Sequence, residues 1–315
     1  MIEHIIGFII GLILLIKISP FIVKYSIKLG EVFRVSPIII GIIAVTIGTT
    51  IPELSTSITS SFLGHGDINV GNVAGSALSN ITLILGLIVL VAGTARTERK
   101  NLFLLGSGVV ISTLIAYTVI ENGFISRLNG IFLIIVYIAL YYVVGNSLTK
   151  PEYLEKKDGM NGSGLVFSAY WKRYVLFLLV GFAGIMIGST ILVSSVISLS
   201  EIFGVPEFIV SFIAVGVGTS LPELFVGVEA VRKGNHELMI GNIMGANITN
   251  LTLVLGSSPL LAPNVVDAGL ILPLWDYLII VSIIVVLIFG LRKKVDRKTA
   301  LLLIIVYFLS YVIIK

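Results

Sequence analysis

The sequence predicts an all-α polytopic membrane protein, with ten transmembrane helices arranged as two inverted five-helix repeats and kinked helices at a central site. Three observations support this expectation. Of the 315 residues, 57% are hydrophobic and only 12% are charged, and the mean hydropathy is +1.09. This is more apolar surface than one soluble core could bury. The apolar runs are long enough to cross a bilayer, and a motif of the first half recurs in the second.

The apolar runs define the spans. The hydrocarbon core of a bilayer takes about 20 helical residues to cross. On this measure we expect spans at 2–23, 36–62, 69–93, 101–120, 128–146, 173–200, 206–231, 238–262, 269–291 and 299–314. Residues 1–146 then form the first five-helix repeat, 147–172 a polar cytoplasmic linker and 173–315 the second repeat.

The distribution of charge predicts the orientation. Acidic residues dominate one set of connections, which holds Glu121, Glu201, Glu207 and Asp267, with Arg127 as its only basic residue. By the positive-inside rule, both termini are extracellular and the protein is a multi-pass component of the cell membrane. Because five spans is an odd number, the second half enters the membrane upside down. The alternate connections hold the basic residues Lys24, Lys28, Arg34, Arg96, Arg99, Lys100, Lys150, Lys156, Lys157, Lys172, Arg173, Arg232, Lys233, Arg292, Lys293, Lys294, Arg297 and Lys298.

A six-residue motif occurs twice inside apolar runs. Gly-Thr-Thr-Ile-Pro-Glu ends at Glu53 in the first half, and Gly-Thr-Ser-Leu-Pro-Glu ends at Glu223 in the second. The same separation along the chain relates Gly-Asn-Val-Ala-Gly, which begins at Gly71, to Gly-Asn-Ile-Met-Gly, which begins at Gly241. Apolar segments interrupted by Gly and Pro at matching places in two halves indicate the binding site of a secondary transporter.

The motif has the chemistry of a cation site. An ionisable side chain at bilayer depth costs about 2.5–3.5 kcal/mol, so Glu53 and Glu223 indicate a function. Pro52 and Pro222 lack amide hydrogens, so we expect the helices to open just before the glutamates. Carboxylates and freed carbonyls are the ligands that Ca²⁺ takes, commonly about six to eight. Two carboxylates also carry the charge that one divalent ion neutralises.

Further oxygen ligands lie nearby in the sequence. The carbonyls of Thr49 and Thr219 are candidates, because each precedes a proline break. Asn80 and Asn250 lie about halfway along their spans, near the expected depth of the glutamates. For these asparagines two interpretations stay open, namely contact with the ion or hydrogen bonds between helices without ion contact.

Other classes of function find less support. The absence of cysteine excludes thiolate metal sites and cysteine nucleophiles. No nucleophile, metal triad or histidine partner accompanies the motifs, so we expect no enzyme and no cofactor. Nothing indicates nucleic-acid binding or an obligate protein partner; the expected partners are the lipid bilayer and the transported ions. A channel would use similar oxygen ligands, but repeats with kinked helices around a central site favour alternating access.

The paired motifs resemble the alpha repeats of the prokaryotic sodium/calcium exchangers in the cation/calcium exchanger superfamily. Proton-coupled relatives usually carry Gly-Asn-x-x-Glu instead, which favours the sodium branch. The resemblance implies an electrogenic Na⁺/Ca²⁺ antiporter with four central cation positions, in which the first and sixth spans slide across the others. It assigns the calcium position to Glu53, Glu223 and the carbonyls of Thr49 and Thr219. It completes the sodium positions with Thr50, Ser76, Asn80, Ser220 and Asn250.

Two departures from the family pattern bear on the coupling ion. The family often has an acidic residue where this chain has Asn250, and a serine where it has Ala246. Within the chain, the position of Thr46 in the first repeat is occupied by Gly216 in the second. The alternative function is therefore a proton-coupled or sodium-independent transporter of Ca²⁺ or another divalent cation. The linker at 147–172 is also too short for the calcium-sensing domain of animal exchangers, so we expect that regulation to be absent.

Overall fold

The computed structural model describes residues 1–32, 46–96, 99–147, 171–232, 234, 236–292 and 294–313, which are almost entirely helical. The first half contains α1 (Ile2–Val32), α3 (Ile51–Phe62), α4 (Gly66–Ser79), α5 (Leu85–Ala92), α6 (Arg99–Ile120) and α7 (Arg127–Ser147). The second half contains α9 (Trp171–Phe203), α10 (Glu207–Val210), α11 (Gly216–Thr219), α12 (Leu221–Arg232), α13 (His236–Thr249), α14 (Leu255–Leu261), α15 (Ala268–Arg292) and α16 (Arg297–Ile313). Within these ranges three π-helical turns interrupt the helices, namely η1 (Asn80–Ile84), η3 (Ser211–Val215) and η4 (Asn250–Val254).

The membrane class predicted from composition is confirmed. In the described part of the chain, seven helical stretches are long and apolar enough to cross a membrane. They correspond to seven of the ten predicted spans and run over Gly66–Ala92, Lys100–Ile120, Arg127–Val144, Trp171–Phe203, Glu207–Arg232, Leu238–Leu261 and Ala268–Leu291. Among the other three predicted spans, 2–23 lies within the 31-residue α1 and 299–314 corresponds to the 17-residue α16. The first part of 36–62 and most of the linker 147–172 lie outside the described residues.

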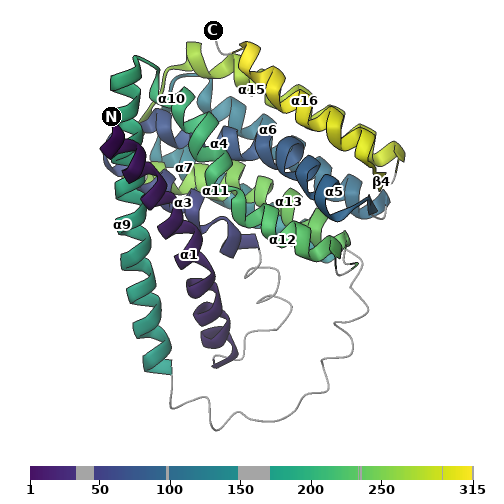
Figure 1. The fold of residues 1–315 in the computed structure, drawn as a ribbon, viewed down its shortest axis with the longest axis horizontal. Helices are drawn as coiled ribbons and strands as arrows, with labels where there is room; N and C mark the ends of the chain where they lie inside the picture. Colours follow the sequence, from purple (N-terminus) through teal and green to yellow (C-terminus); the bar gives the residue numbers. More distant parts are fainter. Residues whose placement is uncertain are drawn as a thin grey trace.

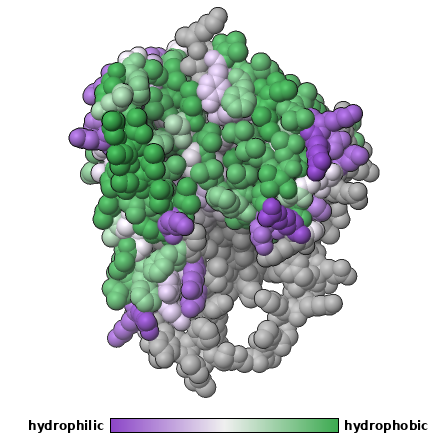
Figure 2. Space-filling model, viewed as in Figure 1, coloured by the Kyte–Doolittle hydropathy of each residue, from purple (hydrophilic) through white to green (hydrophobic). Residues whose placement is uncertain are grey.

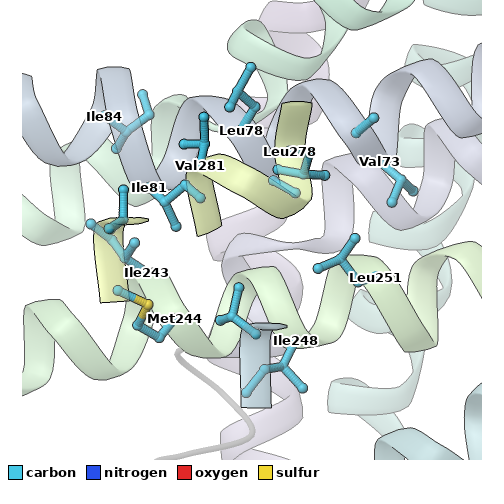
Figure 3. Packing of buried hydrophobic residues seen from close by; sticks show 14 of the residues in the cluster. Val73, Leu78, Ile81, Ile84, Ile243, Met244, Ile248, Leu251, Leu278 and Val281 are labelled. Carbon is cyan, nitrogen blue, oxygen red and sulfur yellow. The ribbon is translucent and has the colours of Figure 1, made fainter. Parts of the chain in front are cut away.

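The chain crosses the centre of the molecule twice, as α4 with η1 and as α13 with η4. Of each membrane stretch that contains them, 83% is buried inside the protein. Figure 3 shows their apolar side chains meeting those of α15. The labelled side chains are Val73, Leu78, Ile81 and Ile84 from the first crossing, Ile243, Met244, Ile248 and Leu251 from the second, and Leu278 and Val281 from α15.

Glycines allow the central helices to approach closely. A Cβ at Gly216 would lie 2.6 Å from the backbone carbon of Gly75, and a Cβ at Gly75 would overlap the backbone of Phe212. Close backbone contact at small residues is the usual way in which helices pack inside a membrane. The contact places η3 and α11 directly against α4, which brings the two proline motifs near each other.

Four short strands join the two halves at the ends of the helices. β1 (Ala95–Arg96) pairs antiparallel with β4 (Lys294–Val295), and β2 (Phe124–Ile125) pairs antiparallel with β3 (Asn264–Val265). Each described strand of one half thus pairs with a strand of the other half.

Several elements of the two halves are separated along the chain by the same number of residues as the two motifs. This holds for the starts of β2 and β4, of α4 and α13, and of η1 and η4.

The helices α1 and α9 pack against each other along one edge and extend beyond the other helices (Figure 1). Apolar side chains cover most of the face seen in Figure 2, where hydrophilic residues gather at the lower end of this pair and at the edges. Many large apolar side chains of α1, α7 and α9 are exposed. This outer surface suits contact with lipid.

Candidate ion-binding site

Both proline motifs interrupt their helices, as the sequence predicts. Thr50 (φ −90°, ψ 4°) separates the helical turn 46–49 from α3, and Ser220 (φ −81°, ψ 4°) separates α11 from α12. Because Pro52 and Pro222 lack amide hydrogens, the carbonyls of Gly48 and Gly218, four residues earlier, lose their usual helical donors. Regular helical bonding resumes just after the glutamates. The amide of Leu54 donates to the carbonyl of Thr50 at 3.0 Å, and the amide of Leu224 donates to the carbonyl of Ser220 at 3.4 Å.

The two glutamates lie directly after these breaks, in the first turns of α3 and α12. Glu53 and Glu223 are both fully buried and lie near each other. Three of their four carboxylate oxygens have no hydrogen-bond partner among the described residues. The fourth, Oε1 of Glu53, accepts from Oγ of Ser220 at 3.4 Å. Helix N-termini favour negative charge, but two buried carboxylates that are both ionised require a counter-ion. The arrangement therefore suits a bound cation.

All nine residues predicted for the site are buried, with exposed fractions of 8% or less. The structure therefore gathers the predicted set in the interior, although the assignment of each residue to an ion remains a prediction. Within the described chain no three His, Cys, Asp or Glu side chains form a metal cluster. A cation here would thus depend on two carboxylates plus neutral oxygens. The nine residues are Thr49, Thr50, Glu53, Ser76, Asn80, Thr219, Ser220, Glu223 and Asn250.

Hydroxyl groups surround the Glu53 side of the site. Oγ of Ser76 donates to the carbonyl of Gly216 at 3.2 Å and lies 3.4 Å from Oγ1 of Thr219. Thr219 in turn donates to Oδ1 of Asn72 at 3.3 Å. The hydroxyls of Ser220 and Thr219 therefore lie next to the Glu53 carboxylate, and the hydroxyl of Ser76 lies next to that of Thr219.

The Glu223 side of the site has a different set of polar contacts. Oγ1 of Thr50 donates to the backbone carbonyl of Thr46 at 3.0 Å, while Oγ1 of Thr49 donates to Oδ1 of Asn242 at 3.4 Å. The position equivalent to Ser76 is Ala246, which supplies no hydroxyl. The two halves of the site therefore differ at this position, because Ser76 supplies a hydroxyl in one half and Ala246 supplies none in the other.

The two central asparagines have different surroundings. Nδ2 of Asn80 donates to Oδ1 of Asn247 at 3.1 Å, and Nδ2 of Asn247 donates to the carbonyl of Ala77 at 2.8 Å. Oδ1 of Asn80 and both polar atoms of Asn250 have no partner among the described residues. Asn80 therefore makes the interhelical bond and keeps its oxygen free, whereas both side-chain polar atoms of Asn250 remain available. Each asparagine begins a π-helical turn, a feature often found at functional sites.

Two residues of this network were not predicted as part of the site. Asn247 bridges the central helices, and Asn72 donates to the carbonyl of Glu53 at 3.0 Å and to Oγ of Ser57 at 2.9 Å. Both lie in the repeated Gly-Asn-x-x-Gly blocks or just after them, so a polar side chain within an apolar run was the available signal. Their partners come from other helices, which the sequence pattern alone does not identify.

Comparisons with known proteins bear on the family of this chain. The family model described as "Sodium/calcium exchanger protein" matches residues 3–145 and 173–315. The chain belongs to the sodium/calcium exchanger family. This is a family of membrane antiporters and not of enzymes, and its ions are Na⁺ and Ca²⁺.

Individual relatives extend over most of the chain. The chain is 32% identical to "Inner membrane protein YrbG" of Escherichia coli, over 89% of this chain and 86% of that protein. It is 28% identical to "Sodium/calcium exchanger MaX1" of Methanosarcina acetivorans, over 95% and 94% of the two chains. A solved structure of the sodium-calcium exchanger NCX_Mj, soaked with Na⁺ and Sr²⁺, matches with a TM-score of 0.63 and 27% identity. That match covers 99% of this chain and 98% of NCX_Mj.

Proposed function

We propose that this sodium/calcium exchanger family member is a secondary active antiporter that moves Na⁺ against Ca²⁺ by alternating access, using the site around the two glutamates. The observation that carries the proposal is the fully buried pair Glu53 and Glu223, with three carboxylate oxygens unpartnered within the described chain. One Ca²⁺ neutralises both carboxylates, and so do two Na⁺ ions. Since both cations depend on the same two carboxylates for charge neutralisation, they compete for the site, which is the physical basis of exchange.

The ligands divide by chemistry. Glu53, Glu223 and the carbonyls of Thr49 and Thr219 supply the hard oxygens of the Ca²⁺ position. Neutral oxygens beside the carboxylates suit Na⁺, which carries a single charge. These sodium ligands are Thr50, Ser76, Asn80, Ser220 and Asn250.

The proposed architecture has ten spans in two inverted repeats, with residues 1–146 and 173–315 as the repeats and 147–172 as a cytoplasmic linker. Elements that recur at one constant separation along the chain, and strand pairs that always join opposite halves, support it. The positive-inside pattern supports extracellular termini. The paired helices α1 and α9 are the elements that would slide past the remaining helices to expose the site to each side in turn.

The deciding experiment is ⁴⁵Ca²⁺ uptake into proteoliposomes loaded with Na⁺, compared with vesicles loaded with K⁺ or carrying only a pH gradient. We expect saturable uptake in Na⁺-loaded vesicles, which ends when the Na⁺ gradient is collapsed. Uptake driven only by pH, or with no sodium requirement, would favour the alternative transporter. That outcome would trace the change of coupling ion to Asn250 and Ala246. Uptake that does not saturate would indicate a channel.

A further inference from the structure

The paired helices α1 and α9 are longer than the membrane requires. The hydrocarbon core of a bilayer is crossed by about 20 helical residues, whereas α1 contains 31 residues and α9 contains 33 residues. Figure 1 shows both helices continuing past the other helices at the end where α1 finishes and α9 begins. This end of the pair therefore reaches the depth of the lipid headgroups.

A cavity of about 300 Å³ lies between the two helices at this end. Its lining consists of Tyr25 and Lys28 from α1 and of Arg173, Tyr174 and Phe177 from α9. The rings of Tyr25 and Tyr174 lie 5.9 Å apart, and those of Tyr25 and Phe177 lie 4.7 Å apart. The walls are therefore aromatic, and two cationic side chains converge on the space from opposite helices.

The two cations are held by aromatic rings. Nζ of Lys28 lies 5.6 Å from the ring of Tyr25 and 5.5 Å from that of Tyr174, and Cζ of Arg173 lies 5.2 Å from the ring of Phe177. No described carboxylate forms an ion pair with either cation. Cation–π contacts orient the charges without neutralising them. Their positive charge is thus available to an anionic ligand.

An apolar stripe continues from the cavity along α9. Leu176 and Val180 follow Arg173 by three and seven positions, so the three side chains lie along one face of the helix. Leu176 is 56% exposed and Val180 is 59% exposed. A ligand that fits both features has an anionic head at the cavity and an apolar chain along this stripe.

We propose that the cavity between α1 and α9 binds the phosphate headgroup of an anionic phospholipid in the leaflet on the linker side. The guanidinium of Arg173 and the ammonium of Lys28 contact the phosphate oxygens, the tyrosine hydroxyls hydrogen-bond to the headgroup, and an acyl chain follows Leu176 and Val180. The aromatic rings lie at the interface, where such rings are enriched. A bound lipid would join the ends of the two helices that we propose to slide.

The test measures lipid binding directly, so its outcome does not depend on transport. Purified protein is incubated with phosphatidylglycerol or with phosphatidylcholine of the same acyl chains, and retained lipid is counted by native mass spectrometry. We expect selective retention of phosphatidylglycerol. Since each basic residue near an anionic surface contributes about 1 kcal/mol, the double variant Lys28→Gln/Arg173→Gln should weaken that retention by about 30-fold.

Two further proteins make the result specific. The double variant Arg297→Gln/Lys298→Gln removes the same charge from exposed positions at the start of α16 and should bind as the wild type does. The variant Lys28→Arg/Arg173→Lys keeps the charge and should retain most of the binding. Equal retention of both lipids, equal losses in the two charge-removing variants, or complete displacement by excess glycerol 1-phosphate would each overturn the proposal.

Discussion

The difference between the two halves of the site predicts an effect on sodium affinity. Ser76 brings a hydroxyl within 3.4 Å of Thr219 on the Glu53 side, whereas the equivalent Ala246 brings none to the Glu223 side. Ala246 is fully buried but does not belong to the apolar core cluster. We therefore expect that Ala246→Ser places a new hydroxyl at the site and increases the affinity for Na⁺.

The magnitude follows from the value of an oxygen contact to a charge. A hydrogen-bond-type contact to a charged group contributes about 1.5 kcal/mol, which is about tenfold in a binding constant. Ser76→Ala should thus raise the Na⁺ concentration for half-maximal exchange about tenfold, and Ala246→Ser should lower it by a similar factor. Ca²⁺ affinity should change less, because the carboxylates and carbonyls remain.

The assay is the Na⁺ dependence of ⁴⁵Ca²⁺ exchange in proteoliposomes, with Na⁺ competition against Ca²⁺ binding in detergent as a second readout. Ala74→Ser is the matched control, since Ala74 is a fully buried residue of the apolar cluster on α4. It should leave the sodium affinity unchanged. Shifts of the same sign in Ser76→Ala and Ala246→Ser, or no shift in either, would refute the reasoning from the uneven site.

Three further predictions use five other substitutions in the site and in the helix packing around it. Glu53→Gln and Glu223→Gln should each lower Ca²⁺ uptake by more than about 100-fold, because the amide carries no charge to neutralise the ion. Gel filtration should show that both variants are folded. Wild-type uptake in both would contradict the proposed site. Asn247→Ala should lower the free energy of unfolding by about 1–3 kcal/mol, because the buried side-chain amide of Asn80 loses its acceptor. Thermal unfolding measures this, and an unchanged melting temperature would contradict the role of Asn247. Gly75→Ala should destabilise the protein by about 1–3 kcal/mol, because the new Cβ would overlap the backbone of η3. Gly241→Ala should not, because no atom of another described segment lies within 4 Å of the position of its Cβ. Equal melting temperatures in these two variants would contradict the close packing.

Much of the fold could be predicted because the signals are local. Hydrophobic length identified seven of the spans to within a few residues, since the bilayer sets one common ruler. The breaks at Thr50 and Ser220 follow from the missing amide hydrogens of Pro52 and Pro222, which is a property of the residue type. The constant separation between the two motifs also appears in the structure, where it relates α4 to α13 and η1 to η4.

The candidate site was predictable in its members but not in its contacts. A glutamate in an apolar run is conspicuous in any sequence, and so are the threonines, serines and asparagines around it. Which hydroxyl faces which carboxylate depends on how η3 and α11 cross α4, and that crossing depends on close packing at Gly75 and Gly216. Asn72 and Asn247 therefore became part of the site only in three dimensions.

The sequence by itself thus determined the class of protein, the position of the helix breaks and the residues that carry the charge, because hydropathy, proline chemistry and ionisation belong to single residues. Only the tertiary structure decided that Asn80 bonds to Asn247, while neither polar atom of Asn250 has a partner in the described part of the chain. It also decided that Lys28 and Arg173, far apart in the chain, share one aromatic cavity. These features depend on distances between helices, and such distances are set by side-chain packing across the whole molecule.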